Sequence, residues 1–302
     1  MTQGTVPLVG REDMVENWAD VVADRMVDTS PLRKGTFLLL GAADTGKTTL
    51  LGALAERLVR RRPVALVDAD VGQSHIGPPT TVGWGLRASD AREAVESPAR
   101  GMAFVGDVTP VGHLLQLTAA LALCVEQARQ AAEVVLVDTP GLVTGGAACS
   151  LWWTVQRLLR PEWIIAIQRA DELRELLGGL QAGLSAIETI EAPAPLRRKS
   201  PEARQEHRRR LFEEYFRDAT AHTLNLKGLA VRSTQRMTGD NAAGRIVCLT
   251  DAAGQDMALG VIEHWQPGKA QMTLRVPQLD IRRVQCLTIG NARIEPRVGG
   301  SR

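Results

Sequence analysis

An eight-residue run, Gly41–Thr48, carries the clearest chemistry in the sequence, because its letters GAADTGKT fit the pattern GxxxxGK[ST] in full. In a loop of this kind backbone N–H groups converge on the β-phosphate of a nucleotide, the lysine reaches the β and γ oxygens, and the hydroxyl ligates Mg²⁺. The run lies between an apolar segment and a stretch of helical character, which is the context that the pattern requires. The sequence therefore predicts a nucleoside triphosphate site. The predicted nucleotide-binding residues are Gly41, Ala43, Asp44, Thr45, Gly46, Lys47, Thr48 and Thr49.

Two apolar runs end in aspartate. Val64–Asp68 leads on to Asp70, and Val134–Asp138 is followed by Thr-Pro-Gly. The carboxyl ends of parallel strands share one edge of a sheet, where ligands bind, so we expect these acids beside the phosphate loop. One carboxylate can order Mg²⁺ or its water, while another accepts a proton from an attacking hydroxyl. The predicted magnesium ligands are Thr48, Asp68, Asp70 and Asp138.

Elements that would position these residues follow from the alternation of short apolar runs and helical stretches between residues 35 and 170. The predicted strands are Thr36–Leu40, Val64–Asp68, Val134–Asp138 and Trp163–Gln168, with a further strand beginning at Phe104–Val105. The predicted helices are Glu12–Val27, Thr48–Arg60 and Leu114–Ala132. Apolar runs without alternation imply strands that are covered on both faces. The predicted fold class is therefore α/β, with the parallel sheet of a P-loop NTPase flanked by helices.

A basic helix is predicted beyond the sheet. Ser200 and Pro201 are typical of a helix start, and the helix should run to about Thr220. Between residues 197 and 210 there are seven cations and two acids, a local net charge of +5. Arg204 and Arg208 share one face at helical spacing. Such a helix can be a lid that neutralises charge on a moving phosphoryl group, or simply a solvated basic face.

The C-terminal part has short alternating segments and turn signals, which predict a small, mostly β module over Leu229–Pro296. The expected domains are a helical lead-in (1–34), a P-loop domain (35–225, with the lid at about 197–220) and a β-rich domain (226–302).

The composition narrows the classes of function. In 302 residues there are 36 basic and 34 acidic side chains, a net of +2, so any nucleic-acid surface must be local. Aromatic residues make up only 4%, so base-stacking platforms cannot be abundant. The four cysteines lie far apart, which fits neither a zinc site nor a disulfide framework and indicates a reducing compartment. With no apolar run long enough to span a bilayer, we expect a cytoplasmic protein without membrane association.

Four features together resemble the polynucleotide 5′-hydroxyl kinase family. They are Gly41–Thr48, the run Asp68-x-Asp70-x-Gly72-Gln73, Asp138-Thr139-Pro140-Gly141, and Arg204…Arg208…Glu214-Tyr215-Phe216. The family includes the kinase subunit of the eukaryotic pre-mRNA cleavage complex, the nucleolar pre-rRNA kinases, and shorter archaeal and bacterial relatives. The resemblance spans roughly residues 35–265 and includes Phe104–His113, which is similar to the family's clasp segment.

This resemblance implies transfer of the γ-phosphate of ATP to the 5′-hydroxyl end of RNA or DNA, with Mg²⁺, in RNA processing. It implies that Asp70 is the base and that Lys47, Arg204 and Arg208 act on the transferred phosphate. The sequence leaves the protein partners unknown. The implied substrate-binding residues are Gln73, Thr109, Pro110 and His113.

Three departures from the family pattern stand out. Leu142 occupies the position where eukaryotic members have a tryptophan that stacks on the terminal base, so this clamp is absent unless Trp152 or Trp153 substitutes. We expect both tryptophans to be core residues of the following helix. His113 stands where asparagine is common. We also expect the large N-terminal domain that helps to hold the nucleotide base in eukaryotic members to be absent, since about 34 residues precede the first predicted strand.

Two other functions stay open on the sequence. A GTPase or ATPase switch of the MinD and signal-recognition class shares the DxD and DTPG strand ends, and Asp171 in Gln168–Asp171 could then select guanine. A catalytically silent scaffold that binds ATP and organises RNA-processing partners is the second alternative.

Overall fold

A computed structural model describes residues 11–29, 34–87, 99–181, 183, 185–193, 200–235 and 237–294. The chain forms two compact units, each assembled from several segments. The first takes in residues 1–68, 85–98 and 125–199, and the second residues 69–84, 99–124 and 200–302. The division into domains 1–34, 35–225 and 226–302 stays a prediction.

The first unit is built on five parallel strands. They are β1 (Gly35–Gly41), β2 (Val64–Asp68), β5 (Val134–Asp138), β6 (Trp163–Gln168) and β7 (Ala186–Glu191). Their order is β2-β5-β1-β6-β7. Every side chain of β2 and β5 is buried, as unbroken apolar runs require. Asp68 and Asp138 are register partners, so the two acids end neighbouring strands at the same edge.

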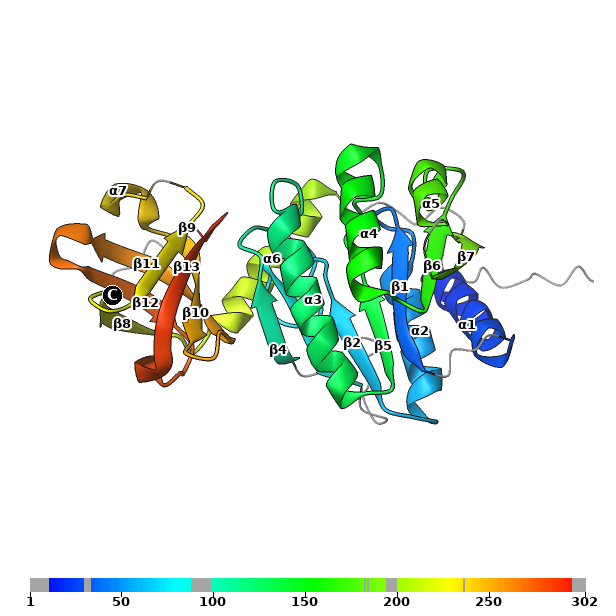
Figure 1. Cartoon of the computed structure of the whole chain (residues 1–302), viewed down its shortest axis with the longest axis horizontal. Coiled ribbons are helices and arrows are strands. Elements are labelled where there is room, and N and C mark those ends of the chain that lie inside the picture. Colours follow the sequence, from blue (N-terminus) through cyan, green and yellow to red (C-terminus); the bar gives the residue numbers. More distant parts are fainter. Residues whose placement is uncertain are drawn as a thin grey trace, which may run out of the picture. The chain divides into compact units, whose positions relative to one another are not determined.

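Helices cover both faces of this sheet. The helices of the first unit are α1 (Arg11–Thr29), α2 (Lys47–Val59), α4 (Gly145–Leu159) and α5 (Arg174–Leu180). Helix α2 packs against β1, β2 and β5 and carries α1 on its outer side, while α4 crosses in front of the sheet (Figure 1). Ion pairs from Arg57 to Asp20 (3.0 Å) and Asp24 (2.5 Å) join α1 to α2. The predicted α/β fold class, a parallel sheet flanked by helices, is confirmed.

The second unit contains a six-stranded sheet of order β8-β12-β11-β10-β13-β9. Its elements are β8 (Thr220–Asn225), β9 (Ala230–Ser233), α7 (Gly239–Ala242), β10 (Arg245–Asp251), β11 (Asp256–Gln266), β12 (Gln271–Val276) and β13 (Val284–Arg293). The pairs are antiparallel except for β13 with β9. Val247, Leu274 and Leu287 are fully buried in its core. Strand β4 (Ala99–Phe104) also belongs to this unit. Its neighbour β3 (Thr81–Leu86) and helix α3 (Leu114–Ala131) have residues in both units.

Two predicted boundaries were wrong. The strand expected to begin at Phe104–Val105 instead ends at Phe104, whose N–H donates to Asp256 Oδ2 at 2.8 Å. Helix α6 (Pro201–Tyr215) stops short of Thr220, because Thr220–Asn225 pairs with β12 as an edge strand of the β sheet. Its predicted start is confirmed, since Ser200 Oγ accepts the N–H of Ala203 at 3.2 Å with Pro201 in the first turn.

Aromatic side chains hold α6 against the β sheet of the second unit. Phe212 is buried among Ile246, Cys248 and Leu259. Tyr215 Oη accepts the N–H of Leu259 at 2.9 Å. Because these contacts lie in the last turn, the C-terminal end of α6 has a fixed place on this sheet.

Replacing Tyr215 with Phe should reduce the free energy of unfolding by about 1 kcal/mol, the usual net worth of one hydrogen bond. Burial raises the pKa of Tyr215 to about 12, so its neutral form is favoured in the folded state. Its contribution to stability is therefore complete below pH of about 10 and is lost as the pH rises through the folded value. Urea unfolding of both proteins at neutral and alkaline pH measures this. Because Tyr215 is the chain's one tyrosine, its ultraviolet absorbance reports its titration directly. Ionisation near pH 10 in the folded protein would contradict the buried placement.

In the described part of the chain, no helix combines the length and the apolar character needed to cross a membrane.

Candidate functional site

The phosphate-loop sequence connects the carboxyl end of β1 to the first turn of α2. Its backbone turns through the left-handed region at Asp44 (φ 58°) and Gly46 (φ 91°). A Cβ on Gly41 would lie 2.6 Å from Thr45 Oγ1 and 2.7 Å from the carbonyl oxygen of Ile167, so the loop begins where only glycine fits. The predicted strand–loop–helix context is present, and it places a helix N-terminus at the loop.

Lys47 and Thr48 make the polar contacts expected of such a loop. Lys47 Nζ donates to the carbonyl oxygens of Gly41 (3.0 Å) and Ala42 (2.9 Å). Thr48 Oγ1 donates to Asp138 Oδ2 at 2.5 Å. The loop hydroxyl and the carboxylate that ends β5 are therefore already together.

The donor set fits a magnesium ion bound with a nucleotide. Asp68 and Asp138 are 2% and 3% exposed, and they stand with Thr48 at one strand edge as hard oxygen ligands. The described residues include no group of three or more His, Cys, Asp or Glu side chains that could hold a metal together. Mg²⁺ at phosphate sites commonly uses one or two carboxylates, with phosphates and water supplying the other ligands.

Two neighbours support the loop from outside its motif. A Cβ on Gly141 would lie 2.6 Å from the backbone nitrogen of Ala43, so the Asp-Thr-Pro-Gly turn needs its glycine to pack on the loop. Arg169 follows β6 and donates from its guanidinium to the carbonyl oxygen of Asp44. Asp171, which could have selected guanine, is exposed and pairs with Arg174 at 2.9 Å. Sequence reasoning missed the role of Arg169, because no local pattern indicates a contact between residues that are 125 positions apart in the sequence.

The segment after β2 belongs to the second unit and holds Asp70 in a tight turn. Asp70 Oδ1 accepts the N–H groups of Gly72 and Gln73, both at 3.1 Å. A Cβ on Gly72 would lie 2.6 Å from the carbonyl oxygen of Val108, so glycine lets the segment Phe104–His113 come close. The turn fixes the direction of the Asp70 carboxylate.

Gln73 connects this turn to the basic helix. Its Nε2 donates to the carbonyl oxygens of Gly72 (2.6 Å) and Arg204 (3.2 Å). Its Oε1 is buried and accepts no hydrogen bond within the described ranges. The side chain therefore offers an acceptor atom next to Asp70 and the start of α6.

The predicted clasp residues follow β4. Thr109 is exposed, Pro110 is half-buried, and Thr109 Oγ1 accepts the N–H of Val111 at 3.3 Å. The His113 ring lies 2.8 Å from Asn291 Nδ2 through Nε2 and 3.3 Å from the carbonyl oxygen of Val111 through Nδ1. Asn291 on β13 was missed by sequence reasoning, since it lies 178 residues from its partner.

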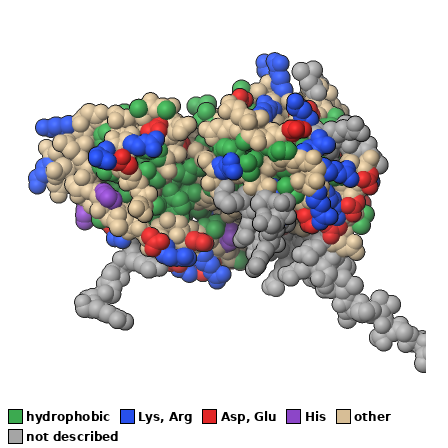
Figure 2. All heavy atoms as spheres, turned by 90° about the horizontal axis from the view of Figure 1, so that it is seen from below, with side chains coloured by type: hydrophobic (Ala, Val, Ile, Leu, Met, Phe, Trp, Pro, Cys, Tyr) green, Lys and Arg blue, Asp and Glu red, His purple; other side chains and the backbone are tan. Residues whose placement is uncertain are grey.

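The arginines of α6 fall into two sets. Arg209 donates to Glu206 and Glu213, and Arg210 donates to Glu206, on the exposed surface. Arg204 and Arg208 are half-buried, and Arg208 forms no ion pair with the part of the chain that the structure describes. The other three predicted cations, Arg197, Arg198 and Lys199, lie outside the described residues. On the face drawn in Figure 2, Lys and Arg are likewise interspersed with Asp and Glu.

The predicted site residues are therefore assembled in two groups. The first unit brings together the phosphate loop, Asp68 and Asp138. The second unit contains Asp70, Gln73, Thr109, Pro110, His113, Arg204 and Arg208, and joins Gln73 directly to Arg204.

Comparison with known proteins supplies the family. Residues 41–218, more than half of the chain, match the sequence family described as mRNA cleavage and polyadenylation factor CLP1 P-loop. The chain belongs to this CLP1 P-loop family. The resemblance found in the motifs is confirmed, and with it a nucleotide-binding P-loop.

Curated relatives of this CLP1 P-loop chain are archaeal. A protein of Methanocaldococcus jannaschii named polyribonucleotide 5′-hydroxyl-kinase is 28% identical over 67% of this chain and 56% of its own length. Proteins with the same name are 29% identical in Pyrococcus abyssi (73% of this chain, 63% of that protein) and 30% identical in Thermococcus kodakarensis (68% and 58%). The chain thus spans about three fifths of the curated relatives that it matches.

A solved structure gives the same fold for this CLP1 P-loop chain. The wild-type Clp1p–Pcf11p complex matches 93% of this chain and 79% of the other chain with a TM-score of 0.70 at 14% identity. A second structure of Clp1p with Pcf11p also gives a TM-score of 0.70.

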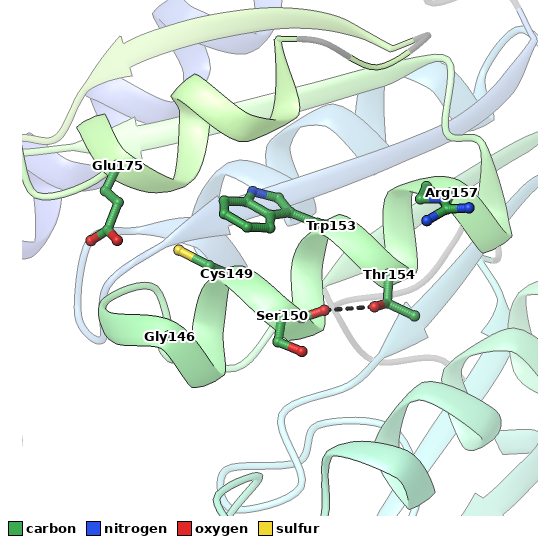
Figure 3. A pocket seen from close by; sticks show the side chains of 7 residues that line it. All are labelled: Gly146, Cys149, Ser150, Trp153, Thr154, Arg157 and Glu175. Carbon is green, nitrogen blue, oxygen red and sulfur yellow. Dashed lines mark hydrogen bonds between the residues drawn. The ribbon is translucent and has the colours of Figure 1, made fainter.

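The two tryptophans of α4 have different environments. Trp152 is fully buried and donates from Nε1 to the carbonyl oxygen of Leu142 at 2.7 Å, as expected of a core residue. Trp153 is 39% exposed, so its expected core placement was wrong. It donates to the carbonyl oxygen of Leu176 at 3.2 Å and lines a pocket of α4 and α5 (Figure 3). The pocket is lined by Gly146, Cys149, Ser150, Trp153, Thr154, Arg157 and Glu175, none of which is a predicted site residue.

Proposed function

We propose that this protein is a polynucleotide 5′-hydroxyl kinase that transfers the γ-phosphate of ATP to the 5′-hydroxyl end of RNA, with Mg²⁺ as cofactor. The observation that carries the proposal is the Thr48–Asp138 pair next to buried Lys47, in a chain of the CLP1 P-loop family. The archaeal relatives named polyribonucleotide 5′-hydroxyl-kinase support RNA as the acceptor, and activity on DNA ends stays a prediction.

In this proposal the first unit holds the nucleotide. The loop Gly41–Thr49 binds the phosphates, and Lys47 neutralises charge on the β and γ oxygens. Thr48, Asp68 and Asp138 would hold Mg²⁺, which supplies charge neutralisation for the transferred group. The residues themselves do little covalent chemistry, so their work is positioning and electrostatic stabilisation.

The second unit would hold the acceptor end. Asp70 accepts the proton of the attacking 5′-hydroxyl, and the two N–H groups on its Oδ1 keep the carboxylate oriented. The buried Gln73 Oε1 is an acceptor for a donor group of the terminal nucleotide. Thr109, Pro110 and His113 form the clasp beside it, and Asn291 fixes the His113 ring.

Charge reversal of Arg204 and Arg208 together should lower kcat by about 100-fold and change the KM for ATP much less. These arginines are the half-buried pair of α6, which we assign to the transferred phosphoryl group. Steady-state kinetics with varied ATP separates the two parameters.

The matched control is charge reversal of Arg209 and Arg210 on the same helix, whose partners are Glu206 and Glu213 on the surface. This control should retain most of the activity. A loss confined to ATP binding in the Arg204 and Arg208 variant would refute the lid role.

Label transfer tests the function itself. The protein is incubated with Mg²⁺, γ-labelled ATP or GTP, and matched 5′-hydroxyl RNA and DNA oligonucleotides. Label on the RNA end with ATP is the expected result, and an oligonucleotide that already carries a 5′-phosphate is the control. Release of free phosphate without labelled oligonucleotide would indicate a switch NTPase, and ATP binding with neither product would indicate a silent scaffold.

A further inference from the structure

Trp18 of α1 packs directly on the phosphate loop. A Cβ built on Gly46 would lie 3.1 Å from Trp18 Cζ3 and 3.6 Å from its Cη2. Pro193 Cδ would lie 3.8 Å from the same point. Gly46 is the residue just before Lys47, so the benzene ring of this indole borders the end of the loop where α2 begins.

One hydrogen bond holds the indole, and three ion pairs hold its helix in place. Trp18 Nε1 donates to the carbonyl oxygen of Glu191, the last residue of β7, at 3.1 Å. Arg25, two turns further along α1, pairs with Glu188 on β7 at 3.1 Å. The Arg57 pairs with Asp20 and Asp24 fasten the same helix to α2. Helix α1 is thus joined to β7 and to α2, and the half-buried ring is held at the carboxyl end of β7.

This position is where the base of a nucleotide would lie. The phosphates of a bound nucleotide occupy the loop and the N-terminus of α2, and the sugar and base extend along the carboxyl edge of the parallel strands. Trp18 lies at that edge, where it contacts Glu191 at the end of β7 and Gly46 at the end of the loop. An indole in such a position offers a flat apolar face to a purine.

The other aromatic side chains of the first unit are not positioned to contact a base at this edge. Phe37 and Trp152 are fully buried. Trp163 begins β6, at the end of the sheet opposite to the phosphate loop. Trp153 is bonded to the α5 backbone.

We infer that Trp18 is a wall of the nucleotide-base site, against which the purine ring of ATP packs. The inference rests on the proposed nucleotide use and adds the residue that contacts the base. Because aromatic stacking tolerates any base, Trp18 contributes to affinity for ATP and GTP alike and leaves the choice between them to other groups.

Calorimetric titration with ATP and with inorganic tripolyphosphate separates a base contact from support of the loop. Both are titrated with Mg²⁺ into the wild-type protein and into Trp18→Ala, Trp18→Leu and Trp18→Phe. We expect Trp18→Ala and Trp18→Leu to bind ATP about 10-fold more weakly and tripolyphosphate unchanged, with Trp18→Phe recovering most of the ATP affinity. Trp18→Leu keeps an apolar side chain packed on Gly46. It therefore separates loss of the aromatic ring from a change in loop conformation that the alanine variant could cause.

Trp153→Ala is the matched control, since it removes another half-exposed indole of the first unit, and it should leave both affinities unchanged. Equal weakening of ATP and tripolyphosphate would overturn the inference, because Trp18 would then only support the loop. Wild-type protein that binds ATP no more tightly than tripolyphosphate would also overturn it, while leaving the triphosphate site intact. Binding of neither ligand would instead refute the proposed function, and the inference with it.

Discussion

Asp70→Asn is expected to lower kcat by about 1,000-fold while ATP binds almost as tightly as in the wild type. The substitution removes the basic carboxylate oxygen but keeps the shape of the side chain. Its remaining oxygen can still accept the N–H groups of Gly72 and Gln73, so the turn is preserved. The expected loss is therefore chemical rather than structural.

Single-turnover label transfer, together with calorimetric ATP titration, measures the two quantities separately. Asp251→Asn is the control, because Asp251 Oδ1 likewise accepts two backbone N–H groups, those of Ala253 (2.9 Å) and Gln255 (3.0 Å), while its Oδ2 pairs with Arg283 on the surface. That variant should keep full turnover. Full activity of Asp70→Asn would refute the base assignment, and a large loss of ATP affinity would show that the carboxylate mainly holds Mg²⁺ and nucleotide.

Contiguous motifs made much of the first unit predictable. The phosphate loop and both aspartate-terminated strands are local patterns, and chain continuity alone carries Lys47 to the end of β1. Because β2 and β5 are parallel neighbours and both end in aspartate, their register places Asp68 opposite Asp138. The fold class followed from the same unbroken apolar runs.

Elements without such runs were missed or misplaced. Strand β7 has Glu188 and Glu191 among its residues and leaves most of its side chains partly or fully exposed, so it lacks the signal of a buried strand. Strand β4 begins with an exposed Ala-Arg pair, and only its last residues are apolar. The helix predicted to run to about Thr220 ends at Tyr215, and edge pairing with β12 makes Thr220–Asn225 a strand that the sequence did not predict.

Long-range contacts account for the rest of what the sequence could not show. Asn291 meets His113, Arg169 meets the loop at Asp44, and Trp18 meets Gly46 and Glu191, each from a distant part of the chain. A single sequence gives the residue types but does not show which distant residues are in contact.

Lys47→Ala should abolish phosphoryl transfer, with a loss of at least about 1,000-fold, and should weaken ATP binding as well. Lys47 is buried at 7% exposure, and its ammonium group is held by two loop carbonyl oxygens where the phosphates bind. Lys47→Arg should fail too, because a planar guanidinium cannot replace a compact ammonium in this space. The combined loss of binding and turnover distinguishes this residue from Asp70.

The measurement is label transfer at saturating RNA, with tripolyphosphate and ATP titrations on the same protein. Lys34→Ala is the control, since it removes an exposed lysine just before β1 and should change neither quantity. Urea unfolding checks that Lys47→Ala is folded, and the Thr48–Asp138 bond gives reason to expect that it is. A Lys47→Ala protein that stays folded and still labels RNA ends at the wild-type rate would place the phosphate-binding charge on another residue.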